Sequence, residues 1–347
     1  MTDVPITAQD RPIRVLVIGA SGYLGSGFRV YGLVRRESAA QVLAVAEVIP
    51  VVSSLSDRDA LRDKLLIHTQ GLAAASFALG IKTMVLWSSG CKHYGMTPLH
   101  GDPNLAPHNE ESPLQGHPII RGRTDAAFRA VAISTADSGA AGFDVAILRA
   151  TPIYGYSGSY YGGSFDYAAA FAAVTPPTEE LRVLKFAADA NTIIHGVHLD
   201  DCGDAYVALA NAALFGADDR HHGRPAVARQ AFNTSGRRCE TLAEIGGALV
   251  KEYGFEGGVR FGVPAEELPG AVSNPAYNLA FGWSQWVSSD KIRRVTGCAD
   301  RRPLFVQNLH VYRLAYEAAA EGLSDPYRPR VETKSDVLQF RKLKDRV

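Results

Sequence analysis

The sequence predicts an α/β protein with a doubly wound parallel sheet and a smaller C-terminal lobe. Three observations lead to this fold class. Residues 13–18 form an apolar run typical of a buried parallel strand, and a glycine-rich turn follows this run at once. Strand patterns then alternate with helix patterns over the first 155 residues, which is typical of a parallel sheet covered by helices.

The predicted elements follow from local residue patterns. β-Branched and aromatic residues between turn residues indicate strands at 13–18, 28–34, 48–52, 82–90 and 144–155. Helices are predicted at 56–66, 71–80 and 126–136. Ser56 is a candidate N-cap for the first helix, and Gly80 ends the second.

Composition excludes several classes of protein. The 36 basic and 36 acidic residues cancel, so we expect no nucleic acid or acidic membrane as a partner. The four cysteines are scattered without a CxxC pair, which favours a reduced, cytoplasmic protein and no metal site. The first residues lack the apolar core of a signal peptide, and no apolar run is long enough to span a membrane.

The glycine-rich turn after the first predicted strand is a candidate dinucleotide-binding loop. Its glycines would let the backbone approach a pyrophosphate at the N-terminus of a helix. The loop residues are Gly19, Ser21, Gly22, Tyr23, Leu24 and Gly25. Arg35 and Arg36 follow the second predicted strand, where an acidic residue reads the ribose of NAD. Guanidinium groups there suit the 2′-phosphate of NADP, although NAD, a plain tight loop and a solvated basic turn remain alternatives.

Six motifs in the same order resemble the extended short-chain dehydrogenases/reductases of the NAD-dependent epimerase/dehydratase family. The similarity covers most of residues 13–320 and implies a Rossmann-type sheet that binds a nicotinamide cofactor. The motifs are VLVIGASGYLG, MVLWSSGCKHYG, AILRATPIYGYSG, HGVHLDDCGDAYVAL, FNTSG and VSSDKIRRVTGCADRRPL.

Two segments of this family pattern are missing. Only residues 19–27 separate the first two predicted strands, whereas a parallel crossover takes about ten to twelve residues or more. The helix after strand 1 is therefore expected to be missing. After Gln70 the chain also lacks the region of strand 4, which would lie beside the first strand. We interpret both gaps as losses from a complete family member, by splicing or an imperfect gene model. A transcript that encodes this chain unchanged and yields folded protein would contradict this interpretation.

The chain also lacks the usual catalytic pair of this family, a Tyr-x-x-x-Lys on a helix. Aligned on the helical stretch RTDAAFRAVAIS, Arg121 stands at the tyrosine position and Asp125 at the lysine position. Arginine cannot act as a general acid near neutral pH. A helical i, i+4 ion pair between the two side chains is the favoured interpretation.

A second resemblance offers a different proton donor. GFRVYGLVRRES and SGCKHYG are similar to progesterone 5β-reductase/iridoid synthase-like reductases, which reduce conjugated enones with NADPH. In that family a lysine in TGxKHY assists catalysis, and it corresponds to Lys92, although the partner tyrosine falls at Arg121. Ser88 is a candidate cofactor contact, and Ser89 is a candidate hydroxyl for a substrate carbonyl. Tyr94 is a candidate catalytic residue or a core residue, and the usual hydroxyl position of the larger family falls on Gly90.

A tyrosine-rich loop follows the last predicted strand of the main sheet. It contains Tyr154, Tyr156, Tyr160 and Tyr161, and we expect it to form a wall of the substrate site. Tyr160 or Tyr161 could replace the missing acid. Trp283 and Trp286 are interpreted as packing residues.

The predicted organisation is an incomplete Rossmann domain over residues 1–155, a substrate lobe over 156–330 with segments that return to the main domain, and a polar tail over 331–347. Three functions stay open, with a homodimer as a candidate assembly. The first is an NAD(P)-dependent oxidoreductase of the epimerase/dehydratase type that acts on a small carbonyl or sugar-like substrate. The others are an enone reductase that uses Lys92 and a catalytically silent NAD(P)-binding sensor.

Overall fold

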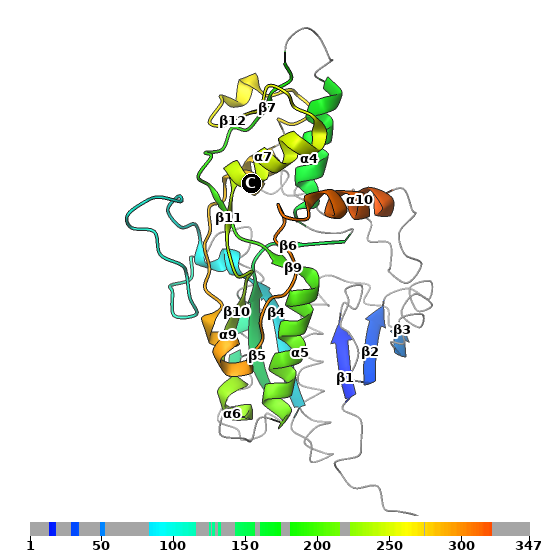
Figure 1. Cartoon of the computed structure of the whole chain (residues 1–347). Helices are drawn as coiled ribbons and strands as arrows, with labels where there is room; N and C mark the ends of the chain where they lie inside the picture. Colours follow the sequence, from blue (N-terminus) through cyan, green and yellow to red (C-terminus); the bar gives the residue numbers. More distant parts are fainter. Residues whose placement is uncertain are drawn as a thin grey trace, which may run out of the picture.

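A computed structural model describes the strands of the N-terminal region and most of the chain from residue 83 to residue 320 (Figure 1). The described residues are 14–18, 29–34, 49–52, 83–115, 125, 127–128, 131–132, 143–156, 160–174, 181–215, 223–273 and 275–320. The helices predicted at 56–66 and 71–80 lie outside these residues.

The first three strands form one parallel sheet in the order β1-β2-β3. Their bounds are β1 (Arg14–Ile18), β2 (Arg29–Val34) and β3 (Ile49–Val52). Each strand begins one residue later than predicted and ends where predicted. Ile18 is opposite Leu33 in parallel register, so β1 and β2 end at the same edge of the sheet. The parallel pairing of β1 with β2 is present although only residues 19–28 connect them.

A second parallel sheet has the order β10-β5-β4. Its strands are β4 (Thr83–Gly90), β5 (Phe143–Ala150) and β10 (Ala231–Thr234). Among the described strands, β1 and β4 are not hydrogen-bonded neighbours, so the two sheets are separate. Residues 53–82 lie outside the described residues, so the missing strand stays a prediction.

The strand predicted at 144–155 is divided in two. β5 ends at Ala150, and the short β6 (Ile153–Tyr154) pairs instead with β9 (Val197–His198). Pro152 stands between them, and proline has no N–H for a sheet ladder. The break directs the chain from the sheet into the lobe.

Side chains of the second sheet alternate between its two faces. Ala146 and Leu148 of β5 pack with Leu209 of α5 (Leu199–Phe215) and Ile292 of α9 (Asp290–Thr296). Phe143 and Val145 of β5 pack on the opposite side with Val131, within the helix predicted at 126–136. Full burial of each large apolar side chain contributes about 1.5–3 kcal/mol to folding. The sheet is thus covered on both faces, as predicted for a doubly wound fold.

The lobe has an aromatic core and lies beyond the carboxyl ends of β4, β5 and β10 (Figure 1). Tyr167 stacks on Phe186 with ring centroids 5.0 Å apart, and Phe186 stacks on Phe261 at 5.6 Å. The lobe helices are α4 (Gly162–Val174), α7 (Leu242–Tyr253), α8 (Pro275–Gly282) and α10 (Leu309–Ala320). The domain boundary at 155/156 stays a prediction.

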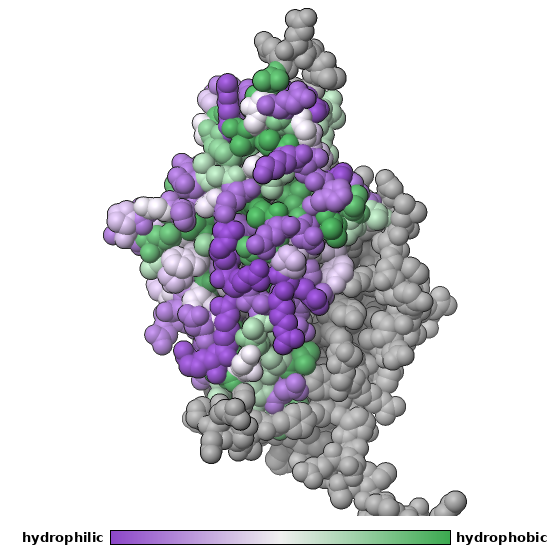
Figure 2. All heavy atoms as spheres, viewed as in Figure 1, coloured by the Kyte–Doolittle hydropathy of each residue, from purple (hydrophilic) through white to green (hydrophobic). Residues whose placement is uncertain are grey.

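Short elements complete the described fold. They are η2 (Cys91–Tyr94), β7 (Leu184–Lys185), β8 (Ile193–Ile194), α6 (Arg224–Val227), β11 (Glu240–Thr241), β12 (Val259–Arg260) and η3 (Ala265–Glu267). Hydrophilic side chains gather over the middle of one face, between the lobe and the sheet (Figure 2). None of the described helices combines the length and the apolar character needed to cross a membrane.

Glu240 of β11 makes the stability of this fold depend on pH. Its side chain is buried, and its carboxylate accepts a hydrogen bond of 2.9 Å from the backbone of Val306. Burial raises the pKa of Glu240 to about 7, because the charged form loses its water. The folded chain therefore binds this proton more tightly than the unfolded chain, and folding becomes less favourable as the pH rises through the interval from the ordinary glutamate pKa to about 7.

We predict that Glu240→Gln removes this pH dependence. The amide keeps an acceptor for Val306 and has no charge to bury. The free energy of unfolding of the variant should exceed that of the parent by roughly 3 kcal/mol at about pH 8, and the difference should shrink towards about pH 5. Urea unfolding of both proteins at both pH values measures this difference in the free energy of unfolding. A difference that does not change with pH would contradict the assignment.

Candidate functional site

The candidate site lies at the common carboxyl edge of β4, β5 and β10. Gly90 is opposite Ala150 in the register, and Ala150 is opposite Thr234, so the three strands end together. Ligands of open α/β sheets bind at this edge. The short turn η2 follows β4 directly and places Lys92 there.

The turn that carries Lys92 is fixed by its backbone. The amide of Gly95 donates to the carbonyl of Lys92 at 3.1 Å, and the amide of Gln115 donates to the carbonyl of His93 at 2.7 Å. Gly95 has a φ of +83°, and a Cβ at this position would overlap the side chain of Gln115. The positive φ therefore favours glycine at this position.

Two aromatic rings form walls around the Lys92 amine. Its Nζ lies 4.5 Å from the centroid of the Trp283 ring and 5.3 Å from that of the Tyr160 ring. Tyr160 precedes α4, and Trp283 follows α8, so the two rings come from separate parts of the lobe. Lys92 and Tyr160, which belonged to rival hypotheses for the missing acid, thus lie in one cluster. Trp283, interpreted from sequence as a packing residue, is the third member.

The amine of Lys92 can exist in either protonation state near neutral pH. Burial lowers its pKa to about 7, because the ammonium loses hydration and no carboxylate of the described residues pairs with it. The two ring faces offset part of this cost, since each such contact is worth about 0.5–2 kcal/mol. Burial also raises the pKa of Tyr160 to about 12, so the phenol stays protonated.

The two candidate serines lie on opposite faces of β4. Ser88 faces α5 and accepts a hydrogen bond of 2.6 Å from the hydroxyl of Tyr206. Ser89 faces the other side, where its buried Oγ has no hydrogen-bond partner among the described residues. An unpaired buried hydroxyl costs about 1–3 kcal/mol, and Ser89 is the candidate serine that carries this cost.

Ser89 belongs to a row of polar side chains across the sheet. It is opposite Arg149 of β5 in the register, and Arg149 is opposite Asn233 of β10. Arg149 Nη1 donates to the Tyr94 hydroxyl at 2.6 Å, and this hydroxyl donates to Asn233 Oδ1 at 2.8 Å. The sequence analysis did not single out Arg149, although a charged residue near the carboxyl end of a mostly apolar strand is a signal for it.

Tyr94 is a support of the site and is not retained as a catalytic residue. Its side chain is fully buried, and its hydroxyl is engaged both as donor and as acceptor. Burial raises the pKa of Tyr94 to about 12, although the Arg149 charge opposes this rise. The lysine two residues earlier, in contrast, reaches the carboxyl edge of the sheet.

The tyrosine-rich loop does not form a single wall. Tyr154 and Tyr161 are buried in the lobe core, where Tyr161 donates to the carbonyl of Ile194 at 3.4 Å. Tyr156 has a φ of +54° and donates to Asp200 at 2.7 Å. Tyr160 is the one member of the four that the structure places beside Lys92, because successive loop residues turn in different directions.

Several predicted site residues lie outside the described residues. They are the glycine-loop residues Gly19, Ser21, Gly22, Tyr23, Leu24 and Gly25, together with Arg35, Arg36 and Arg121. Asp125 is described as an exposed helical residue. These positions stay predictions.

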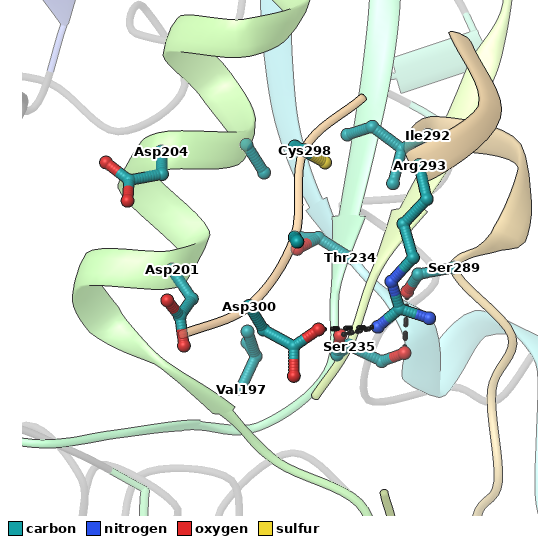
Figure 3. A pocket seen from close by; sticks show the side chains of 12 residues that line it. Val197, Asp201, Asp204, Thr234, Ser235, Ser289, Ile292, Arg293, Cys298 and Asp300 are labelled. Carbon is teal, nitrogen blue, oxygen red and sulfur yellow. Dashed lines mark hydrogen bonds and ion pairs between the residues drawn. The ribbon is translucent and has the colours of Figure 1, made fainter. Parts of the chain in front are cut away.

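A small pocket lies apart from Lys92, between α5, α9 and the end of β10 (Figure 3). Arg293 bridges it by donating to the Asp300 carboxylate at 3.0 Å and to the Ser235 carbonyl at 3.1 Å. Asp201 accepts hydrogen bonds from the amides of Arg301 and Arg302. These polar groups hold the chain segments together, and we assign no ligand to this pocket. Across the described residues no group of three or more metal-ligating side chains comes together.

Comparison with known proteins shows which fold this is. The sequence matches no protein-family model and no curated protein. The structure resembles dTDP-glucose 4,6-dehydratase from Streptomyces venezuelae with a TM-score of 0.58 and 18% identity, over 91% of this chain and 100% of that chain. It resembles UDP-glucose 4-epimerase from Bifidobacterium longum with a TM-score of 0.53 and 14% identity, over 88% of this chain and 98% of that chain. The corresponding epimerase from Thermotoga maritima gives a TM-score of 0.52 and 14% identity, over 89% and 100% of the two chains.

The chain has the fold of an extended short-chain dehydrogenase/reductase. Its structural neighbours are NAD-dependent epimerases and dehydratases, as the motif order in the sequence predicted. The dehydratase from Streptomyces venezuelae was solved with NAD bound, and the epimerase from Bifidobacterium longum with NAD⁺ and UDP. At these identities the likeness establishes the fold alone.

Lys92→Met should stabilise the folded chain at and below neutral pH. The folded-state pKa of Lys92 is lowered, so the cost of burying its charge is fully present below about pH 7 and disappears as the pH rises towards the ordinary value of 10.5. Each unit of pKa shift corresponds to about 1.4 kcal/mol. Denaturant unfolding at about pH 6 and about pH 10 should show a gain of a few kcal/mol only at the lower value. A loss of stability at the lower pH would show that the Lys92 side chain stabilises the fold.

Proposed function

We propose that this chain is a nicotinamide-dinucleotide-dependent oxidoreductase that acts on a carbonyl compound, with Lys92 as the proton carrier. The observation that carries this proposal is the Lys92 amine between Trp283 and Tyr160 at the carboxyl edge of the sheet. The fold supports the cofactor class, since similar structures were solved with NAD or NAD⁺ bound. The bound nicotinamide would supply hydride chemistry at this edge.

The strand arrangement fits a dinucleotide. β1 and β2 end at one edge in parallel register, so the segments that begin at Gly19 and Arg35 both start there. Glycine-loop residues 19–25 would hold the pyrophosphate, and Arg35 with Arg36 would hold the 2′-phosphate of NADP. Ser88 lies at the end of β4 with an exposed side chain, and we propose that it contacts the cofactor.

Lys92 would perform the proton transfer that the missing tyrosine performs elsewhere. Its ammonium can donate a proton to the oxygen of a substrate carbonyl as negative charge develops there. A group whose pKa lies near the working pH is suited to both donation and return of the proton. Ser89 would position the same oxygen, because its buried hydroxyl lacks a partner among the described residues. Trp283 and Tyr160 would exclude water from the amine.

The same site fits a conjugated enone as a second candidate substrate. The flat aromatic walls of Trp283 and Tyr160 suit a planar unsaturated carbonyl better than a polyhydroxylated sugar, which would need more hydrogen-bonding side chains. A sugar nucleotide remains the substrate class suggested by the titles of the neighbouring structures. Reduction of a panel that contains both classes distinguishes them.

Removal of Lys92 should abolish turnover. With NADPH and a panel of enones, ketones and sugar nucleotides, Lys92→Met should lower kcat/KM by about 10²–10⁴-fold, the usual contribution of a general acid. Lys251 of α7 is the control, because its side chain is exposed and belongs to a lobe helix. Lys251→Met should retain activity. Equal activity of the parent and Lys92→Met would refute the role of Lys92.

Tight NADPH binding by the parent without turnover of any substrate would identify a silent cofactor-binding protein instead. Should Tyr160→Phe remove turnover while Lys92→Met does not, the proton would come from Tyr160.

Cofactor choice should depend on Arg35 and Arg36. Replacement of both by glutamate should remove the preference for NADPH over NADH, since each charge-assisted hydrogen bond contributes about 1.5–3 kcal/mol. Fluorescence titration with both cofactors measures the preference. Arg182→Glu, a lobe variant, is the control for a general change in charge. Equal affinity of the parent for NADPH and NADH would show that the two arginines form only a basic turn.

A further inference from the structure

Gln285 joins the lobe to the turn that carries Lys92. Its backbone amide donates to the carbonyl of Ile193 at 3.0 Å, which fixes it to β8. Its side chain is 4% exposed, and its Nε2 donates to two carbonyl oxygens of the turn region. These are the carbonyls of Cys91 at 2.9 Å and Gly95 at 2.6 Å. Since only an amide NH₂ can donate to two acceptors, the orientation of this side chain is fixed by its contacts.

The two bonds lie on either side of Lys92. The carbonyl of Lys92 accepts from Gly95, and that of His93 accepts from Gln115, so Gln285 completes the hydrogen bonds of the turn. Trp283, two residues before Gln285, supplies the nearer ring wall. One short segment therefore holds the turn and covers the amine.

We propose that Gln285 is a positioning residue for Lys92. This inference rests on the proposed function, because it gives Gln285 a role only if Lys92 carries the proton. By occupying the carbonyls of Cys91 and Gly95, Gln285 keeps these acceptors from binding the Lys92 ammonium. It also keeps the amine between Trp283 and Tyr160. Both effects favour the uncharged amine relative to a hydrated lysine.

The other end of the Gln285 amide supports this interpretation. Its Oε1 is buried and has no hydrogen-bond partner among the described residues. An unsatisfied buried acceptor costs about 1–3 kcal/mol. The hydrogen bonds of this side chain are therefore those of its NH₂ group, which contacts the Lys92 turn.

The test measures the titration of Lys92 without any need for turnover. The full chain is labelled with trace acetic anhydride across a pH series, and mass spectrometry gives the reactivity of Lys92 relative to the exposed Lys251. Gln285→Met removes both hydrogen bonds with little change in length. We expect the pKa of Lys92 to rise by at least about one unit, so that its free-amine fraction at neutral pH falls about fivefold.

Two further variants keep the test decisive. Gln285→Glu should also raise the pKa of Lys92, since a carboxylate beside the turn favours the ammonium. This variant replaces Gln285→Met in the test if Gln285→Met does not fold. Ser284→Ala is the matched control: it removes bonds of 3.2 Å to Pro98 and Ile193 from the same segment but none to the Lys92 turn. We expect Ser284→Ala to leave the pKa of Lys92 unchanged.

The outcomes separate this inference from the proposed function. Unchanged titration of Lys92 in both Gln285 variants, or an equal shift in Ser284→Ala, would overturn the role of Gln285 alone. An ordinary lysine titration in the parent chain would overturn the proposed function itself.

Discussion

The parallel register of β4, β5 and β10 is the constraint on which the candidate site depends. Because Gly90, Ala150 and Thr234 lie side by side, whatever follows each strand starts from one edge. The turn with Lys92 follows β4, the path to Tyr160 follows β5, and the segment that leads to the lobe follows β10. A slip of one residue in β4 would exchange the faces of Ser88 and Ser89 and break the row formed by Ser89, Arg149 and Asn233.

The site contains buried charged groups whose polar atoms are only partly paired. Lys92 is buried without a carboxylate partner among the described residues, and the Nε of Arg149 is buried without a hydrogen bond within the same set. Aromatic faces and the Tyr94 hydroxyl offset part of this cost. Residues that oppose stability in this way are typical of functional sites. Glu240 differs from Lys92, because its buried carboxylate accepts a hydrogen bond from the backbone amide of Val306.

Much of the fold could be predicted from the sequence, because it is encoded locally. Strand ends at Ile18, Val34 and Val52 follow from short apolar runs, whereas the break after Ala150 was not predicted although Pro152 explains it. The motif order identified the fold, which the structural neighbours confirm.

The site could be predicted only in part. Lys92 was a candidate because of its motif. Trp283 and Gln285, which contact Lys92 and its turn, lie about 190 positions later in the sequence, and no local pattern encodes such a contact. The loop tyrosines are the same residue type, but their side chains point in different directions. The sequence therefore could not distinguish Tyr160, which lies beside Lys92, from the buried Tyr161. Tyr94 was ambiguous for the same reason, since its burial depends on Asn233 and Arg149.

The titration of Lys92 with oxidised and with reduced cofactor tests the central claim most directly. NADP⁺ and NADPH carry the same phosphates and differ by the positive charge of the oxidised nicotinamide ring. If Lys92 lies beside this ring, NMR of lysine labelled with ¹⁵N at Nζ should show a pKa lower by about one unit with NADP⁺ than with NADPH. The Lys92→Arg variant assigns the signal. The same Lys92 pKa in both complexes would contradict the claim that Lys92 carries the proton at the nicotinamide.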